Sequence, residues 1–442
     1  GPAGADGGAQ EGARMKMDAV IVGAGLAGLA AAETLTDAGL QVVVLERGDG
    51  PGSKNVTGGR LYVDPVRDLF PEWWAEAPLE RPVTHEAWTL LDAGRSVRID
   101  LQDEALGGQL PQSYTVLRGK FDAWLGDRVM GKGAFVIPQK PVAELLWEGN
   151  TVAGVRVEGE EIPAHAVIAC DGVLSFVGKA GRLRDCPEPK TVAVGVKEVI
   201  GLPAGTIEDR FQLEEGQGAA ELFVGHVTEG LLGGGFCYTN RESLSLGLVV
   251  GVGDLVAKGA GKKVPELFEG FKNHPRVRAL TRGGELLEYS AHLIPEGGLN
   301  AVPRLVENGL LLAGDAAGLA LNMGFTVRGM EFALASGRMA AQTLLEARER
   351  EDYSAASLVS YSRKLQESFV WKYLEAYREM PEILENPDLF TRYPAEICRL
   401  LAGLARLDRD KPAKIGPKVW EFARKNLLSR KGLKVLNQLR KL

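Results

Sequence analysis

The sequence predicts an α/β fold in which a parallel, dinucleotide-binding type of β-sheet carries an inserted antiparallel β-sheet and is followed by a helical C-terminal region. Three observations predict it. A buried strand, a glycine-rich turn, a helical pattern and a second strand follow one another within residues 18–46. Consecutive β-type segments dominate residues 191–289, and residues 349–442 are mostly helical. Strands alternating with helices favour a parallel sheet, and consecutive strands favour an antiparallel one.

Length and composition agree with a globular chain. The 442 residues, 45% apolar and 25% charged, suffice for two or three structural units. No apolar run approaches the ~20 residues of a membrane-spanning helix, so an integral membrane protein is not expected. With a net charge of −6, no nucleic-acid partner is expected.

The four cysteines lie far apart in the chain and have no cluster or zinc-ligand spacing, so no metal is expected: Cys170, Cys186, Cys237 and Cys398. Their scarcity favours the cytoplasm, at most at the cytoplasmic face of a membrane. Residues 1–14, rich in glycine and alanine, are expected to be a disordered leader or an expression remnant.

The glycine-rich turn carries the first chemical signal. Gly23, Gly25 and Gly28 follow the strand at residues 18–22 and open a helix, and Glu46 ends the next strand. The glycines let the backbone approach a pyrophosphate at the helix N-terminus, where free N–H groups and the helix dipole favour anions. Glu46 is expected to accept hydrogen bonds from a ribose. This pattern predicts a dinucleotide site.

Two later motifs distinguish FAD from NAD. The strand at residues 309–313 ends in Gly314 and Asp315, in a sequence that looks like the motif with which FAD enzymes hold the ribityl chain and pyrophosphate. Asp171 and Gly172 resemble the Asp-Gly motif of para-hydroxybenzoate-hydroxylase-like flavoproteins. The fold is therefore expected to contain a Rossmann-type FAD-binding domain of the para-hydroxybenzoate-hydroxylase or geranylgeranyl-reductase kind.

Longer segments resemble one family closely. Residues 52–62, Gly-Ser-Lys-Asn-Val-Thr-Gly-Gly-Arg-Leu-Tyr, are similar to a segment of the FixC family. FixC proteins are flavoproteins of the FixABCX complex and relatives of electron-transfer-flavoprotein:quinone oxidoreductase. Further matches, at residues 114–125, 194–198, 233–240, 288–298 and 321–330, extend the resemblance over nearly the whole chain after Met15.

The resemblance implies an FAD-dependent oxidoreductase that takes electrons from an electron-transfer flavoprotein, with FixA- and FixB-like subunits, and passes them toward a membrane quinone. An electron carrier needs a flavin held close to its partners, so no catalytic side chain is assigned. The chain lacks the C-terminal cysteines with which the larger quinone oxidoreductase binds a four-iron cluster. A separate ferredoxin-like subunit, the FixX counterpart, is therefore implied, and any electron bifurcation would belong to the partner flavoprotein.

The residues expected at the cofactor come from the motifs and from the resemblance. Arg47 is expected on the adenine side, and paired glycines before Arg60 would let backbone N–H groups approach the flavin ring. Arg118 resembles the family arginine that contacts FAD; the alternative is an exposed surface arginine. The segments at 58–60 and 324–326 are expected beside the flavin ring; the alternative for each is a plain turn. The complete expected set is Gly23, Gly25, Gly28, Glu46, Arg47, Gly58, Gly59, Arg60, Arg118, Asp171, Gly172, Gly314, Asp315, Gly324, Phe325 and Thr326.

A quinone-like ligand is expected beside the triple glycine Gly233, Gly234 and Gly235, because glycine in a strand suggests close approach by a ligand or another backbone. A β-bulge is the alternative. Tyr289 and His292 are expected to line the same cavity, although an isolated histidine is more often structural.

The order of strand and helix patterns along the chain gives the expected domain boundaries. Residues 15–80, 110–185 and 300–348 are expected to form a discontinuous FAD-binding domain. Residues 81–109 and 186–299 would form the β-sheet domain for the quinone. Residues 349–442 would form the helical region, whose last 42 residues hold twelve Lys and Arg against three Asp and Glu. This basic, amphipathic tail is expected to contact an anionic membrane surface, to dock a protein or to cap the fold.

Other functions remain open at this point. Geranylgeranyl reductases, which reduce isoprenoid double bonds, share the flavin scaffold, but their Tyr-x-Trp-x-Phe-Pro motif is not met at residues 289–295. An aromatic hydroxylase rests on the Asp-Gly motif alone. A non-catalytic flavin-binding assembly subunit would bind FAD that accepts electrons from no partner.

Overall fold

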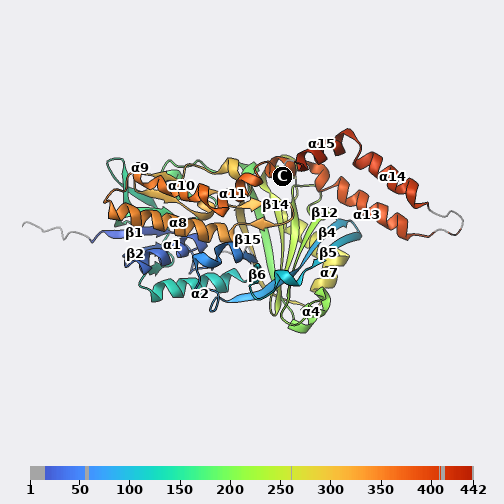
Figure 1. Cartoon of the computed structure of the whole chain (residues 1–442), viewed down its shortest axis with the longest axis horizontal. Helices are drawn as coiled ribbons and strands as arrows, with labels where there is room; N and C mark the ends of the chain where they lie inside the picture. Colours follow the sequence, from blue (N-terminus) through green and yellow to red (C-terminus); the bar gives the residue numbers. More distant parts are fainter. Residues whose placement is uncertain (1–14, 55–58, 260, 408, 410–413, 441–442) are drawn as a thin grey trace, which may run out of the picture.

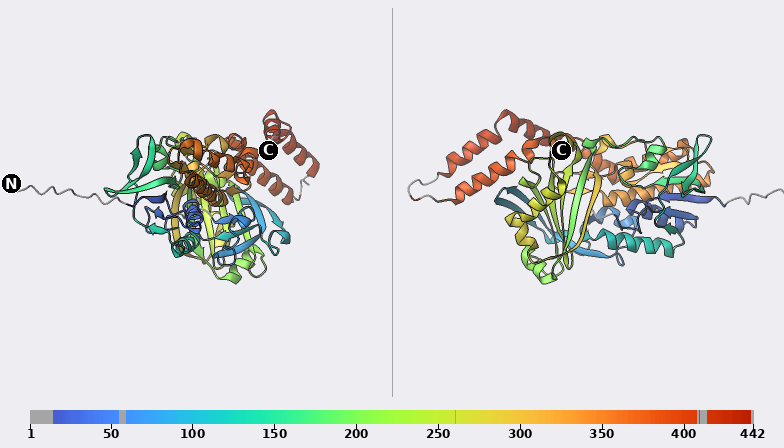
Figure 2. Two further views of the ribbon diagram at one scale, coloured as in Figure 1. Left: turned by 60° about the vertical axis from the view of Figure 1, so that its left-hand side comes forward. Right: turned by 180° about the vertical axis from the view of Figure 1, so that it is seen from behind.

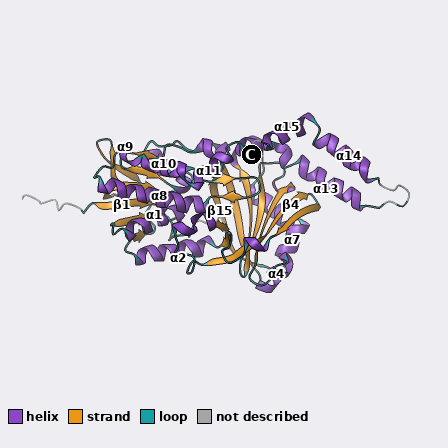
Figure 3. Ribbon diagram, in the orientation of Figure 1, coloured by secondary structure: helices purple, strands orange, loops and turns teal. Residues whose placement is uncertain are grey.

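The computed structural model describes residues 15–54, 59–259, 261–407, 409 and 414–440. Two large β-sheets lie side by side, with helices packed against each of them (Figures 1 and 3). The described residues also form a small two-stranded sheet, β18 Leu321–Asn322 with β19 Val327–Arg328. The leader at residues 1–14 and Gly58 lie outside the described residues.

The first sheet is mostly parallel and forms the N-terminal core. Its strand order is β16-β17-β10-β1-β2-β7, with the β8–β9 hairpin added at β10. Strands β2 and β17 are apolar and buried throughout, and so are residues 19–22 of β1 and 166–169 of β10, as expected of parallel strands covered on both faces. The bounds are β1 Met17–Val22, β2 Val42–Leu45, β7 Phe135–Ile137, β8 Glu144–Glu148, β9 Thr151–Val157, β10 Glu160–Ala169, β16 Val306–Glu307 and β17 Leu310–Leu312.

Three long helices cover this sheet. They are α1 Leu26–Asp37, α2 Arg118–Gly131 and α8 Met330–Glu349. α1 and α8 cross closely, because Gly337 of α8 lies against the Ala27 backbone, where a Cβ atom would collide with the carbonyl oxygen. The short helices α10 Ser360–Glu367 and α11 Phe369–Ala376 complete this layer (Figure 1).

The second sheet is mostly antiparallel, in the order β15-β11-β14-β13-β12-β4-β6-β3, with β5 paired to β4. One pair, β12 with β4, is parallel. Helices α4 Ala204–Phe211, α6 Val264–Asn273 and α7 Pro275–Thr281 cover it. The strands are β3 Arg60–Tyr62, β4 Leu79–Asp92, β5 Arg95–Gln102, β6 Ser113–Val116, β11 Val192–Gly201, β12 Gly218–Gly225, β13 Gly233–Thr239, β14 Ser243–Gly251 and β15 Glu285–Pro295.

The element bounds differ from the sequence pattern in one region. Residues 81–109 are expected in the β-sheet domain without a strand being placed there, and the structure has the fourteen-residue β4, Leu79–Asp92, at the start of this range. Two strands from ranges expected in the FAD-binding domain, β3 and β6, are hydrogen-bonded in the second sheet, next to β4. Pairing of this kind joins distant segments, so no local periodicity reveals it.

The C-terminal region continues from α12 Met380–Leu384 into three helices, α13 Arg392–Ala405, α14 Ile415–Asn426 and α15 Arg430–Leu439. The first half of α13 packs on the second sheet beside β4, and its second half extends from the body with α14 as an antiparallel pair (Figures 1 and 2). Within the described part of the chain, no helix combines the length and apolar character needed to cross a membrane.

Candidate functional site

A cavity of about 550 Å³ lies where the carboxyl ends of the first sheet meet the face of the second. Val22, Leu45 and Cys170, at or just after the ends of β1, β2 and β10, line one side. Residues of β12, β13, β14 and β15 line the other. Ligands of open α/β sheets bind outside the carboxyl ends of their strands, so this is the expected place for a nucleotide.

The glycine-rich turn forms the floor of the cavity at the start of α1. Gly23 has φ +104°, and a Cβ there would collide with the Cys170 carbonyl oxygen. Gly25 is the N-cap of α1, which has no side-chain cap and no acidic residue in its first turn. Its N-terminal N–H groups are therefore free of a side-chain cap and suited to an anion. Gly28 does not line the cavity, because it packs against the Gly23 carbonyl.

Glu46 lines the cavity beside this turn and is fixed by two backbone donors. Its carboxylate accepts hydrogen bonds from the N–H of Ala24, at 2.9 Å, and of Gly48, at 2.6 Å. Each oxygen keeps a further lone pair, so the carboxylate can still accept a hydrogen bond from a ribose hydroxyl. Arg47 also lines the cavity.

Arg118 and Asp315 form the charged wall. Arg118 opens α2 and forms a bidentate pair with Asp122, at 2.8 and 2.7 Å. Its side chain is 12% exposed, so it is not the exposed surface arginine of the alternative interpretation. Burial raises the pKa of Asp315 to about 6, although the nearby Arg118 charge lowers it. Gly314 precedes Asp315 and donates its N–H to the Ser336 hydroxyl at 3.0 Å.

The Asp-Gly motif, Asp171 and Gly172, lies in a turn at the cavity wall, and the Asp171 carboxylate stabilises this turn. Asp171 accepts a hydrogen bond from the Ser175 hydroxyl, at 2.7 Å, and from the Val177 N–H, at 2.9 Å. Burial raises the pKa of Asp171. Gly172, with φ +80°, lines the cavity next to it. The Asp171 carboxylate thus shapes the start of α3, Phe176–Ala180.

Arg60, the first residue of β3, and Gly59, which precedes it, line the cavity. A Cβ on Gly59 would lie 2.5 Å from the Tyr238 ring, so glycine allows the two to pack. The Arg60 guanidinium is buried in a bidentate pair with Glu86 and donates to the Ser113 hydroxyl at 3.0 Å.

Of the three residues expected beside the flavin at 324–326, two line the cavity and one does not. Gly324 and Thr326 line the cavity, and the Thr326 hydroxyl lies 2.7 Å from the Tyr62 hydroxyl. Phe325 does not line it: the side chain is 47% exposed and packs edge-on against Tyr377.

Of the residues expected beside a quinone, all but Tyr289 line the cavity. Gly233, Gly234 and Gly235 line the cavity on β13, but they also allow close packing within the second sheet. A Cβ on Gly234 would lie 2.6 Å from the Phe223 carbonyl oxygen. His292 lines the cavity and Tyr289 does not, because an odd separation along β15 places the two on opposite faces. Burial, with two arginines nearby, lowers the pKa of His292 to about 4.

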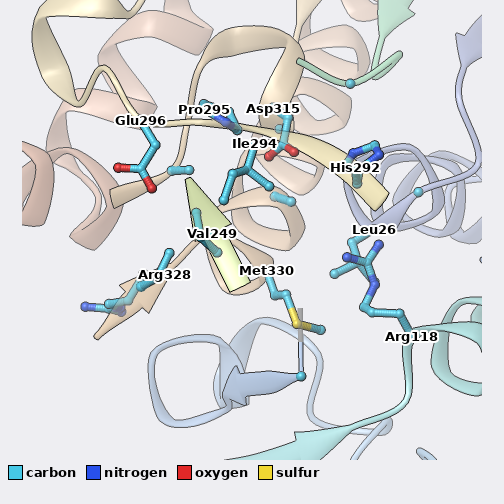
Figure 4. A pocket seen from close by; sticks show the side chains of 18 of the residues that line it. Leu26, Arg118, Val249, His292, Ile294, Pro295, Glu296, Asp315, Arg328 and Met330 are labelled. Atoms are coloured by element: carbon cyan, nitrogen blue, oxygen red, sulfur yellow. The ribbon is translucent and has the colours of Figure 1, made fainter. Parts of the chain in front are cut away.

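Sequence reasoning missed a second, largely apolar end of the cavity. Its wall comes from three strands, from the residue before β13 and from the segment that begins with α12. Its side chains are those of an ordinary core, so no sequence signal marks them. The apolar wall contains Trp88, Leu222, Val224, Leu232, Val249, Leu384 and Phe390. Two polar residues at this end were also missed, Glu296 and Arg328. Figure 4 shows both at the opposite side of the cavity from Arg118 and His292.

The residues present fit FAD. The uncapped N-terminus of α1, the Gly23 turn that no Cβ could occupy and the fixed Glu46 carboxylate suit an adenosine diphosphate half. The cavity continues from there past Asp315 to an apolar region suited to a flat ring.

Comparison with known proteins agrees with this geometry. Residues 21–67 match the NAD(P)-binding Rossmann-like domain family. Among solved structures, a geranylgeranyl bacteriochlorophyll reductase-like protein of Thermoplasma acidophilum superposes with a TM-score of 0.72 at 20% identity, over 96% of this chain and 98% of that one. The myxobacterial halogenase CndH gives a TM-score of 0.63 at 16% identity, over 94% and 99%. The fold and site thus define an FAD-dependent oxidoreductase.

Proteins with similar sequences show to which family of FAD-dependent oxidoreductases the chain belongs. The chain is 46% identical over 89% of its length to a probable electron transfer flavoprotein-quinone oxidoreductase, YdiS of Escherichia coli, covering 91% of that protein. It is 44% identical over 92% of its length to FixC of Salmonella typhi, covering 95%. The chain belongs to the FixC family of flavoproteins.

Proposed function

We propose that this chain accepts electrons from an electron-transfer flavoprotein and passes them to a quinone. The observation that carries the proposal is one cavity with two chemically different ends. A glycine turn and helix N-terminus suited to a dinucleotide lie at one end, and an apolar wall lies at the other. The name of the 46% identical relative, which is matched over 91% of its length, supports the same reaction.

FAD supplies the redox chemistry in this proposal, and the chain supplies binding and orientation. The α1 N-terminus and Glu46 hold the adenosine diphosphate half, and Asp315 and Arg118 lie along the path toward the ring. The apolar end, beside Gly233–Gly235 and Val249, holds the quinone. Leu384 and Phe390 close this end from the C-terminal region, so a long apolar tail would meet the segment that leads to α13.

We also propose two further partners. A ferredoxin-like subunit would supply the iron–sulfur centre, because the four cysteines of this chain are far apart in sequence. An anionic membrane surface would bind the C-terminal helices. Trp420 is 63% exposed on α14, and exposed leucines on α15 alternate with exposed lysines. Exposed apolar and basic side chains on one helix suit a lipid headgroup region.

The reaction is tested by the absorbance of the purified holoprotein under anaerobic conditions. We expect the flavin band to persist after addition of NADH or NADPH, to bleach after a reduced electron-transfer flavoprotein is added, and to return after a quinone is added. Rapid bleaching by NADPH alone would instead indicate a reductase or hydroxylase. A flavin that accepts electrons from no donor would indicate an assembly subunit.

A further inference from the structure

Glu296 occupies an unusual position in the cavity wall. It follows β15, and its N–H donates to the Thr191 carbonyl at 2.8 Å, which fixes the backbone. Among the described residues its carboxylate has one hydrogen-bond partner, the Asn322 amide nitrogen at 3.3 Å. The Asn322 amide oxygen accepts from the Gly324 N–H at 2.9 Å, so the amide orientation is set by its own backbone turn. Glu296 is half-buried and lines the cavity, on the side where Figure 4 shows Arg328.

Several largely buried carboxylates of the described chain are, in contrast, paired with cations. Glu86 pairs with Arg60 and Glu221 with Arg276. Arg328, the cation near Glu296 in Figure 4, is paired with Glu331 at 2.5 Å, and its guanidinium lies 4.0 Å from the Tyr373 ring centroid.

The remaining charged groups around Glu296 do not compensate its charge either. Lys190, on the segment before β11, is 68% exposed and pairs with Glu188. On the other sides of the cavity, His292 has a pKa lowered to about 4 and Asp315 carries an acid group. Burial therefore raises the pKa of Glu296 to about 7, and the Asn322 hydrogen bond lowers it only in part.

We propose that Glu296 donates a proton to the electron acceptor that binds in this cavity. The inference rests on the proposed function. Reduction of a quinone to a quinol takes two electrons, which the reduced flavin supplies, and two protons. The O–H bond of the Glu296 carboxyl breaks and an O–H bond forms on one quinone oxygen. The second proton, and the proton that later returns to the Glu296 carboxylate, come from bulk solvent, which receives in exchange the protons that the reduced flavin loses on oxidation.

The rate of quinone reduction by the holoprotein tests this role across pH 5.5 to 9. Glu296→Gln keeps an oxygen that accepts from Asn322 but cannot release a proton. We expect the wild-type rate to fall as pH rises through about 7, because the carboxyl loses its proton. E296Q should be ~10²-fold slower at pH 6, with a flat profile. Glu285→Gln, at the exposed start of β15, is the matched control and should follow the wild type.

Thermal unfolding of the same holoproteins reports on the Glu296 proton without turnover. A carboxyl whose pKa is raised by folding stabilises the protein fully below its unfolded value of about 4.5, and this contribution is lost as pH rises through about 7. E296Q should therefore melt above the wild type at pH 8 and together with it at pH 5.

Three outcomes are distinguishable. An E296Q protein with the wild-type rate and pH profile overturns the proton-donor role while leaving the proposed function standing. A melting difference that is the same at pH 5 and pH 8 also overturns it, because Glu296 would then not titrate. A wild-type holoprotein that reduces no quinone contradicts the proposed function itself.

Discussion

At the scale of single residues, several charged side chains of the site already have hydrogen-bond partners within the protein, so they are held in place without a ligand. Glu46 is held by the Ala24 and Gly48 N–H groups, and Arg118 by Asp122. Such preset partners reduce the ordering that a bound cofactor would otherwise require. Glu296 differs, because one weak amide contact leaves its proton available.

Replacing Glu46 tests how much this arrangement contributes to cofactor binding. Glu46→Ala leaves two N–H groups of the cavity wall without their acceptor and removes the ribose partner. We expect FAD affinity to fall ~10- to 100-fold, because each unmet donor costs about 1–3 kcal/mol. Flavin fluorescence during titration of the apoprotein measures the change. Glu148→Ala, whose side chain is 72% exposed, should bind FAD as the wild type does; equal affinity of both variants would contradict the role of Glu46.

At the scale of elements, the position of α1 decides the geometry of the cavity floor. β1 leads into the Gly23 turn, and α8 presses α1 onto the first sheet through the close contact of Gly337 with the Ala27 backbone. Interiors are packed as densely as crystals, so an added methyl group has no space to fill. The helix N-terminus is thereby held at the cavity.

Gly337→Ala tests this contact. The added Cβ would collide with the Ala27 carbonyl, so we expect the free energy of unfolding to fall by about 1–3 kcal/mol. Denaturant unfolding followed by circular dichroism measures it. Gly270→Ala in α6, with no atom within 4 Å of the new Cβ, should be neutral or stabilising. An equal loss in both variants would show that helix propensity, not packing, sets the effect.

At the scale of the whole molecule, the apolar end of the cavity and the projecting helices belong to one connected region. Leu384 of α12 and Phe390 line the cavity, and α13 begins immediately afterwards at Arg392. α14 and α15 come next in the chain, and the exposed side chains of α15 mix leucines with lysines. The C-terminal region would thus contact both the tail of a bound quinone and a lipid surface.

Charge reversal on α15 tests the membrane contact. Lys431→Glu with Lys434→Glu removes two exposed cations, and at about 1 kcal/mol each we expect binding to anionic vesicles to fall roughly 30-fold or more. Cosedimentation with phosphatidylserine vesicles at low and high salt measures the effect. Lys190→Glu with Lys263→Glu makes the same charge change at exposed positions away from α15 and should bind normally. Unchanged binding of the α15 variant would refute the contact.

The sequence by itself determined the dinucleotide turn, the second Gly-Asp motif and the family, because these depend on local backbone requirements that glycine and a few acids satisfy. Short-range periodicity also indicated most strands of both sheets. Tertiary structure alone decided that β4 lies beside β12 and that Tyr289 and Phe325 lie away from the cavity. It also brought Glu296, Arg328 and Phe390 to the apolar end. These outcomes depend on strand register and on contacts between residues far apart in the chain, which no single segment encodes.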